Sequence, residues 1–138
     1  MADFEAKKDQ LETIISKRVK HIIYENQRVL DAVTALEKND MIRFGQLLNQ
    51  SGQSALDLYD LAENTPELRF LMETAQKLDG VLGARNMGGG FSAIILALVK
   101  NEALTQFQKY LQTKYQEKFP GRLDFVQFTP NQSIKVIV

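Results

Sequence analysis

Three adjacent glycines, Gly88, Gly89 and Gly90, are the residues of this chain best suited to contact a ligand through the backbone. They lie in residues 84–93, ARNMGGGFSA, between a short and a long apolar segment. Glycine runs are costly to order, and their unobstructed N–H groups can form a nest for an anion. The run lacks the lysine and Ser/Thr of a P-loop and the spacing of G-x-G-x-x-G. Two interpretations stay open: a tight connection between strands, or a loop that contacts a phosphate.

No catalytic arrangement accompanies the glycines. Phosphoryl transfer needs positioned phosphates, a metal held by carboxylates or a hydroxyl, and a base. The candidate acids follow no recognisable pattern and are expected to be caps, turn residues or surface charges: Asp57, Asp60, Asp79 and Asp124. Ser92 adjoins the loop, but the only histidine, His21, is distant in sequence, and there is no cysteine. The residues predict a domain that contacts a phosphate, with no catalytic residue and no metal site of its own.

Composition and charge favour a single soluble domain. The chain has 138 residues, 44% of them hydrophobic, with 17 basic and 17 acidic residues. A nucleic-acid-binding domain usually carries a basic excess, so one local basic cluster is expected to be a solvated helix face: Lys17, Arg18, Lys20, His21 and Arg28. No apolar run approaches the roughly 20 residues that span a bilayer, and the first residues contain no signal-peptide core. We expect a cytoplasmic protein with no nucleic-acid or membrane partner.

The elements before the glycines are predicted to be helices. Apolar residues three, four and seven apart predict an amphipathic helix over 8–38 with an unusually broad apolar face: Leu11, Ile15, Val19, Ile22, Val29, Val33 and Leu36. A second helix starts near residue 41, with an interruption at Ser51 and Gly52. A third begins at Pro66, because proline suits the first helical position.

Strands are predicted on both sides of the glycines, at 80–85 and 93–99. The second is apolar at every position, which favours a central strand buried on both faces. Another helix runs from residue 101 to Pro120, and two more strands are predicted at 123–128 and 134–138. This order predicts an α+β domain with helices packed on a small antiparallel or mixed sheet.

Several segments resemble motifs of galactokinases, which belong to the GHMP family of small-molecule kinases. Residues 83–93, GARNMGGGFSA, resemble the third signature motif, G-[SA]-R-[ML]-T-G-G-G-F-G-G-[CS], which precedes an apolar strand. Upstream segments are similar to other family motifs and occur in the family order: HIIYENQRVL at 21–30 (H-V-V-x-E-N-x-R-V), FGQLLNQS at 44–51 (F-G-x-L-M-N-x-S), LDLY at 56–59 and TPEL at 65–68. Together they cover most of the chain.

The resemblance implies the fold of a GHMP kinase C-terminal domain, a ferredoxin-like α+β layer with a small antiparallel sheet packed against helices. It implies one domain over 1–138, helical over 1–79 and sheet-containing over 80–138. The loop would line the cleft near the transferred phosphate and the sugar, through Met87, Gly88, Gly89, Gly90 and Phe91. The chain departs from the motif at Asn86, at Met87, where a hydroxyl is lost, and at Ser92 and Ala93.

The same resemblance implies an ATP-dependent kinase that phosphorylates a monosaccharide such as galactose at the 1-position. The full-length parent would use ATP and Mg, but we expect neither to bind tightly to this chain. The family's sugar-recognising, phosphate-loop and catalytic segments belong to an N-terminal domain, and none occurs here. We therefore expect a truncated domain, or one half of a split protein, that is inactive without its N-terminal partner.

Two further expectations concern partners. The alternative function is a non-catalytic ligand-binding or interaction module derived from the same domain. In addition, apolar surface that an N-terminal domain would cover promotes association when it is exposed. The chain is therefore expected to form a homo-oligomer at high concentration.

Overall fold

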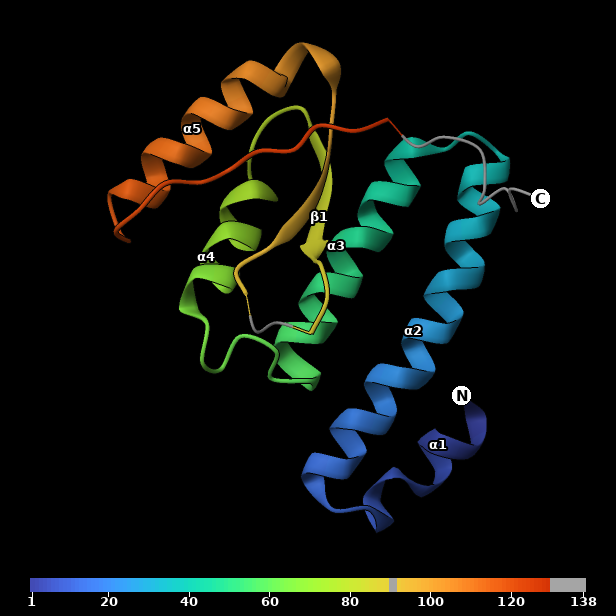
Figure 1. The fold of residues 1–138 in the computed structure, drawn as a ribbon. Helices are drawn as coiled ribbons and strands as arrows, with labels where there is room; N and C mark the ends of the chain where they lie inside the picture. The colour runs from blue at the N-terminus through green and yellow to red at the C-terminus, as the bar shows by residue number, and fades with distance from the viewer. Residues whose placement is uncertain (90–91, 130–138) are drawn as a thin grey trace, which may run out of the picture.

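The computed structural model describes residues 1–89 and 92–129, which form five α-helices and a two-stranded antiparallel sheet (Figure 1). The α+β class is thus confirmed. The elements are α1 (Ala2–Lys7), a 3-10 turn (Lys8–Gln10), α2 (Thr13–Glu37), α3 (Met41–Leu58), α4 (Pro66–Ala75), β1 (Val81–Asn86), β2 (Ile95–Val99), a second 3-10 turn (Asn101–Ala103) and α5 (Leu104–Gln116). No helix of the described residues is long and apolar enough to cross a membrane.

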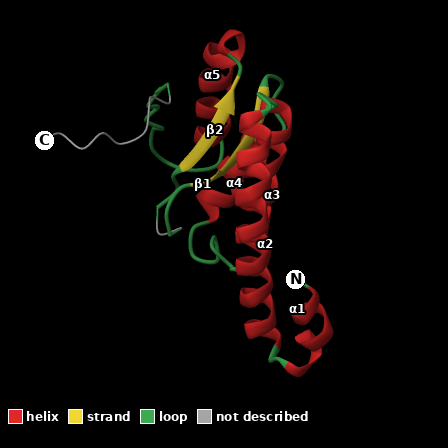
Figure 2. Cartoon of the chain, turned by 90° about the vertical axis from the view of Figure 1, so that its right-hand side faces the viewer, coloured by secondary structure: helices red, strands yellow, loops and turns green. Residues whose placement is uncertain are grey.

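Strand β1 lies between α3 on one side and α4 with α5 on the other. It pairs with β2 so that Ala84 lies opposite Ala97. Ala84 is fully buried in a cluster with residues of α4 and α5, whereas its neighbour Gly83 touches Gly45 of α3. Successive residues of a strand face opposite sides, so both sides of β1 are covered. In Figure 1, α3 lies between β1 and α2, and Figure 2 shows the same elements turned by 90°, with α2 and α3 overlapping in the view.

Glycines allow α3 to pack directly on β1. A Cβ atom at Gly45 would lie 2.2 Å from the carbonyl oxygen of Leu82, and one at Gly83 would lie 2.1 Å from the carbonyl oxygen of Gly45. Seven residues further along α3, a Cβ at Gly52 would lie 2.5 Å from Cε of Met72. The FGQLLNQS segment therefore brings the helix backbone against the strand that leads into the glycine loop.

The helix predictions were right in type but wrong in several details, and the helix predicted from residue 101 to Pro120 is α5, Leu104–Gln116, after a 3-10 turn. Instead of one helix over 8–38, α1 and a 3-10 turn precede α2, which begins at Thr13. The chain is extended at Leu11, and α1 lies beside α2, where the Tyr24 hydroxyl donates to Glu5 at 3.0 Å. The predicted interruption at Ser51 and Gly52 is absent, because both residues are buried against neighbouring elements within a continuous α3.

The strand predictions were right around the loop and wrong after α5. Residues 123–128 form no strand: the backbone N–H of Leu123 donates to the Gln112 side chain, at 3.0 Å, and Phe125 packs edge-on to Phe107. All residues of β2 are only partly buried, rather than buried on both faces, because β1 is its only strand neighbour among the described residues. The predicted strand at 134–138 lies outside the described residues.

The side of α2 that packs on α3 is largely polar. Arg18, His21 and Glu25 each contact α3 or the turn after it, so the basic cluster is not simply a solvated face. The apolar stripe instead faces solvent, and Ile22 and Val29 are 52% and 60% exposed. Helical periodicity located this stripe correctly, but the core formed by the described residues does not cover it.

Candidate functional site

The loop between β1 and β2, residues 87–94, begins and ends with backbone pairing. The Met87 N–H donates to the Ile94 carbonyl at 3.0 Å. The Asn86 side-chain amide donates to the Gly88 carbonyl at 3.1 Å. Gly88 has a φ of 76°, a conformation that other residues rarely adopt. The start of the loop therefore has a defined shape that depends on glycine.

The structure places the first three predicted site residues on an exposed surface. Met87 is 52% exposed, and Gly88 and Gly89 are also exposed. A Cβ added at Gly88 would meet nothing within 4 Å, so its backbone faces open space. The other two predicted residues, Gly90 and Phe91, lie outside the described residues. The segment connects two strands, as one interpretation predicted, yet its open glycine backbone also suits a ligand contact.

Side chains from two helices hold the strand that carries the loop. The Asn49 side-chain oxygen, from α3, accepts a hydrogen bond from the Ala84 N–H at 2.8 Å. The Gln76 amide, just beyond α4, donates to the Ala84 carbonyl, also at 2.8 Å. Together they satisfy backbone groups of β1 that would otherwise be unpaired, and they fix the strand three residues before the loop begins.

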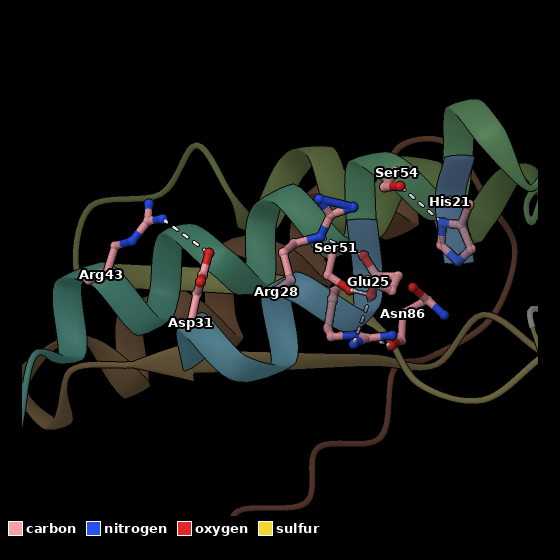
Figure 3. A network of polar contacts seen from close by, with 9 residues as sticks. His21, Glu25, Arg28, Asp31, Arg43, Ser51, Ser54 and Asn86 are labelled. Carbon is pink, nitrogen blue, oxygen red and sulfur yellow. Dashed lines mark hydrogen bonds and ion pairs between the residues drawn. The ribbon is translucent and has the colours of Figure 1, made fainter. Parts of the chain in front are cut away.

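Glu25 is the centre of a polar network that joins α2, α3 and β1 (Figure 3). Its carboxylate accepts hydrogen bonds from Arg28 Nε and from the Ser51 hydroxyl, both at 2.5 Å. Arg85 of β1 forms a longer ion pair with the same carboxylate, at 4.0 Å. Arg85 also donates through Nε to the backbone carbonyl of Asn86 at 3.2 Å. The network thus extends from the middle of α2 to the last residue of β1.

The surroundings of Glu25 keep it ionised. Burial is the largest effect and raises the pKa of Glu25, but the hydrogen bonds from Ser51 and Arg28 and the charge of Arg28 outweigh it. The pKa of this carboxyl therefore lies below its ordinary value. The Glu25 side chain is 21% exposed and that of Arg28 is 15% exposed, so water screens the pair only partly.

His21 lies one turn before Glu25 and packs against the end of α3. Its Nδ1 lies 2.9 Å from the Ser54 hydroxyl, and its ring lies 5.1 Å from the Tyr59 ring, centre to centre. Burial lowers the pKa of His21, which favours the neutral ring at pH 7. The sequence alone gave no reason to connect His21 with Ser54, because 33 positions separate them.

The acidic residues considered for catalysis are not gathered at the loop. Asp60 pairs with Arg18 at 2.8 Å, Asp57 accepts from the Gln53 amide, and Asp124 lies 3.9 Å from Arg122 on the surface. The described part of the chain contains no group of three or more His, Asp or Glu side chains that could hold a metal ion.

Residues that sequence reasoning did not assign are the ones that support the loop. They are Glu25, Asn49, Ser51, Gln76 and Arg85. Most lie in the ENQRV, NQS and GAR portions of the segments that resemble galactokinase motifs. The signal was therefore present as a resemblance, but periodicity and composition could not reveal that three distant segments meet.

The match to known proteins covers most of the chain. Residues 32–117 match the family model described as GHMP kinases C terminal. This chain belongs to the GHMP kinase family. Its sequence is 38% identical over 131 residues to a galactokinase of Mannheimia succiniciproducens, a match that covers 94% of this chain and 34% of that protein. A galactokinase of Glaesserella parasuis is 38% identical over 133 residues, with 96% and 34% covered.

A solved structure supports the same assignment within the GHMP kinase family. The structure of Lactococcus lactis galactokinase complexed with galactose matches this chain with a TM-score of 0.78 and 38% identity. The match covers 84% of this chain and 30% of that protein. This GHMP kinase chain spans about a third of the length of the curated relatives that it matches, and it corresponds to the C-terminal domain of galactokinase-like members.

Proposed function

We propose that this GHMP kinase domain supplies one wall of the active-site cleft of an ATP-dependent, galactokinase-like sugar kinase. The wall is the start of the β1–β2 loop, Met87, Gly88 and Gly89, continued by Gly90 and Phe91. An N-terminal domain forms the opposite wall and carries the groups that perform the chemistry. The reaction is transfer of the terminal phosphoryl group of ATP to the 1-hydroxyl of a monosaccharide such as galactose.

One observation carries this proposal: three galactokinase-like segments converge on the strand that leads into the glycine loop. Asn49 and Ser51 of α3 and Glu25 of α2 act on β1 through the Ala84 N–H and Arg85. A backbone loop contributes to phosphoryl transfer only if its N–H groups are held where charge develops. A polar network that ends at the last residue of β1 supports such a role.

The residues of this chain fit contact with a phosphate better than binding of a metal. The exposed, left-handed Gly88 offers a backbone that no side chain obstructs, as an anion nest requires. Mg²⁺ prefers several oxygen ligands, and the described residues hold no cluster of acids that could provide them. ATP supplies the transferred phosphoryl group, and the N-terminal domain would hold both ATP and Mg²⁺.

We propose that residues 1–138 act as a single domain.

The test compares this chain alone with a chimera in which it replaces the matching third of Lactococcus lactis galactokinase. We expect no galactose-dependent ADP formation from the chain alone, and clear turnover from the chimera. Robust turnover by the chain alone would overturn the proposal that an N-terminal domain carries the groups that perform the chemistry. A folded chimera that binds ATP and galactose but does not turn over would favour the alternative, a non-catalytic binding module.

A further inference from the structure

Asn86 is a buried polar residue at the point where β1 leads into the glycine loop. It is the last residue of β1, opposite Ile95 of β2, and it is only 5% exposed. Its side-chain oxygen is buried and accepts no hydrogen bond from the residues that the structure describes. An unpaired buried acceptor lowers stability. Burial alone would favour an apolar residue here, and the motif that residues 83–93 resemble has methionine or leucine at this position.

The nitrogen of the same side-chain amide acts on the loop. Nδ2 of Asn86 donates to the Gly88 carbonyl at 3.1 Å, and because a carbonyl only accepts, this contact fixes which way the amide points. The backbone of Asn86 is held as well, since its carbonyl accepts a hydrogen bond from Arg85 Nε at 3.2 Å. Arg85 pairs in turn with Glu25, so Asn86 lies at the β1 end of the network in Figure 3. The Asn86 side chain is therefore a fixed donor directed at the loop backbone.

The contact with the Gly88 carbonyl determines where the next N–H points. The peptide bond between Gly88 and Gly89 is trans and planar, so its C=O and N–H groups point in opposite directions. Since the Gly88 carbonyl is directed at the buried Asn86 side chain, the Gly89 N–H is directed away from it. Gly89 is exposed, and no group in residues 1–89 or 92–129 accepts a hydrogen bond from its N–H. This N–H is thus an available donor on the open side of the loop.

The chemistry of this donor selects an acceptor as its ligand. Phosphate oxygens are acceptors at neutral pH, and backbone N–H groups of a glycine-rich turn bind them. A Cβ added at Gly88 would meet nothing within 4 Å, so no side chain obstructs the approach. A peptide whose carbonyl already accepts a hydrogen bond is polarised, which makes its N–H a stronger donor. A donor that is held in advance also stabilises charge that develops during a reaction.

We propose that Asn86 is a positioning residue for the phosphate contact: by holding the Gly88 carbonyl, it aims the Gly89 N–H at a phosphate oxygen, that of the transferred group in the proposed reaction. This role rests on the proposed function of the loop, and it identifies which N–H donates and which side chain directs it. Asn86 does not itself touch the phosphate. It provides a donor where an apolar residue would pack better, a loss of stability of the kind that functional sites retain.

The first test uses the full chain and inorganic phosphate, so that its result does not depend on kinase activity. In amide NMR spectra at constant ionic strength, we expect phosphate to shift the Gly89 signal saturably. Asn86→Leu should weaken this binding at least tenfold, or about 1.4 kcal/mol. No phosphate-dependent shift at Gly89, or an equal Kd in the wild type and Asn86→Leu, would overturn the proposal.

The matched control is Gln112→Leu. Gln112 also forms one hydrogen bond to the backbone and has one buried amide atom that is unpaired within the described residues, but it binds the Leu123 N–H rather than the loop. This variant should change the phosphate Kd by less than about threefold. An equal loss of binding in Asn86→Leu and Gln112→Leu would show a general effect of removing a buried amide and would contradict the proposal.

The second test measures kinetics in the chimera with Lactococcus lactis galactokinase. Turnover by the chimera with the unchanged chain tests the proposed function, and the Asn86 variants test the positioning role separately. Neither Asn86→Leu nor Asn86→Asp can donate to the Gly88 carbonyl. We expect both to lower kcat at least tenfold, or about 1.4 kcal/mol, with KM for galactose within about threefold of the unchanged chimera. An unchanged kcat, or a loss confined to KM for galactose, would contradict the proposal.

Urea unfolding of the full chain separates positioning from a structural role. We expect Asn86→Leu to be at least as stable as the wild type, because it removes the unpaired acceptor. A stability loss in Asn86→Leu that matches its loss of kcat in free energy would indicate a merely structural role and overturn the proposal. An inactive chimera with the unchanged chain, together with a Gly89 shift that depends on Asn86, would support the role of Asn86 and count against the proposed kinase function alone.

Discussion

Replacing Glu25 by glutamine would remove the charge at the centre of the network that supports the loop while keeping the shape of the side chain. Two short hydrogen bonds to the carboxylate are weakened, from Arg28 Nε and the Ser51 hydroxyl. The longer ion pair with Arg85 is lost as well. Hydrogen bonds to charged groups contribute roughly 1.5–3 kcal/mol each, and breaking a fully buried ion pair costs about 3–5 kcal/mol.

The loss of stability in Glu25→Gln should be smaller than the value for a fully buried pair, because Glu25 and Arg28 are partly exposed and the Arg28 side chain can turn toward water. We therefore expect Glu25→Gln to lower the free energy of unfolding by about 2 kcal/mol. With a typical urea m-value near 2 kcal/mol/M, the midpoint of urea unfolding would fall by about 1 M. The matched control is Glu117→Gln, which removes the carboxylate of an exposed ion pair with Lys114 and should cost less than about 0.5 kcal/mol.

The pH dependence of the same variant gives a second, independent readout. Because the folded pKa of Glu25 is depressed, its contribution is present above the unfolded pKa and is lost as pH falls through the folded value. The difference between wild type and Glu25→Gln should therefore shrink below about pH 4. A Glu25→Gln midpoint within error of that of Glu117→Gln at pH 7 would refute the claim that this network stabilises the domain.

Three other outcomes follow from named contacts. Gly45→Ala places a Cβ 2.2 Å from the backbone oxygen of Leu82 and should destabilise by roughly 2 kcal/mol or more in urea unfolding, despite alanine's higher helix propensity. In Gly52→Ala the added Cβ lies nearest to the flexible end of the Met72 side chain, so this variant should lose less stability than Gly45→Ala. An equal or larger loss in Gly52→Ala would contradict the described packing of α3 on β1. Since burial lowers the folded pKa of His21, the unfolded chain binds more protons below about pH 6.5. Stability should thus fall from pH 7 to pH 5, and this fall should be smaller in His21→Gln. An equal fall in both proteins would count against a partly buried, neutral His21 ring in the folded state.

Local signals in the sequence predicted much of the fold. Proline at the first helical position located the start of α4 at Pro66. The predicted start of a helix near residue 41 agrees with α3, which Asp40 caps by accepting from the Arg43 N–H. The strands on either side of the glycines followed from apolar runs that glycine interrupts. These features depend on residues close to one another in the chain, so a single sequence is sufficient to recognise them.

The remaining features depend on contacts between distant segments. Periodicity found the apolar stripe of α2 but could not show that α3 packs on the polar side, through His21 and Glu25. A strand was predicted at 123–128, yet the Leu123 N–H donates to the Gln112 side chain and no strand forms there. For the same reason, the support of the loop by Asn49 was visible only as a resemblance to galactokinase motifs.

The central claim, that the shape of the glycine loop serves sugar phosphorylation, is tested most directly by comparing two glycine variants in the chimera with the Lactococcus lactis galactokinase. Gly88 and Gly121 both have a positive φ, 76° and 108°, and neither would bring a Cβ within 4 Å of another group. Valine therefore strains the backbone similarly at both positions, but only Gly88 lies in the loop. We predict that Gly88→Val lowers kcat/KM for galactose by at least about 100-fold, or 2.7 kcal/mol, while Gly121→Val leaves it within about threefold. Equal kcat/KM values for the two folded variants would contradict the claim.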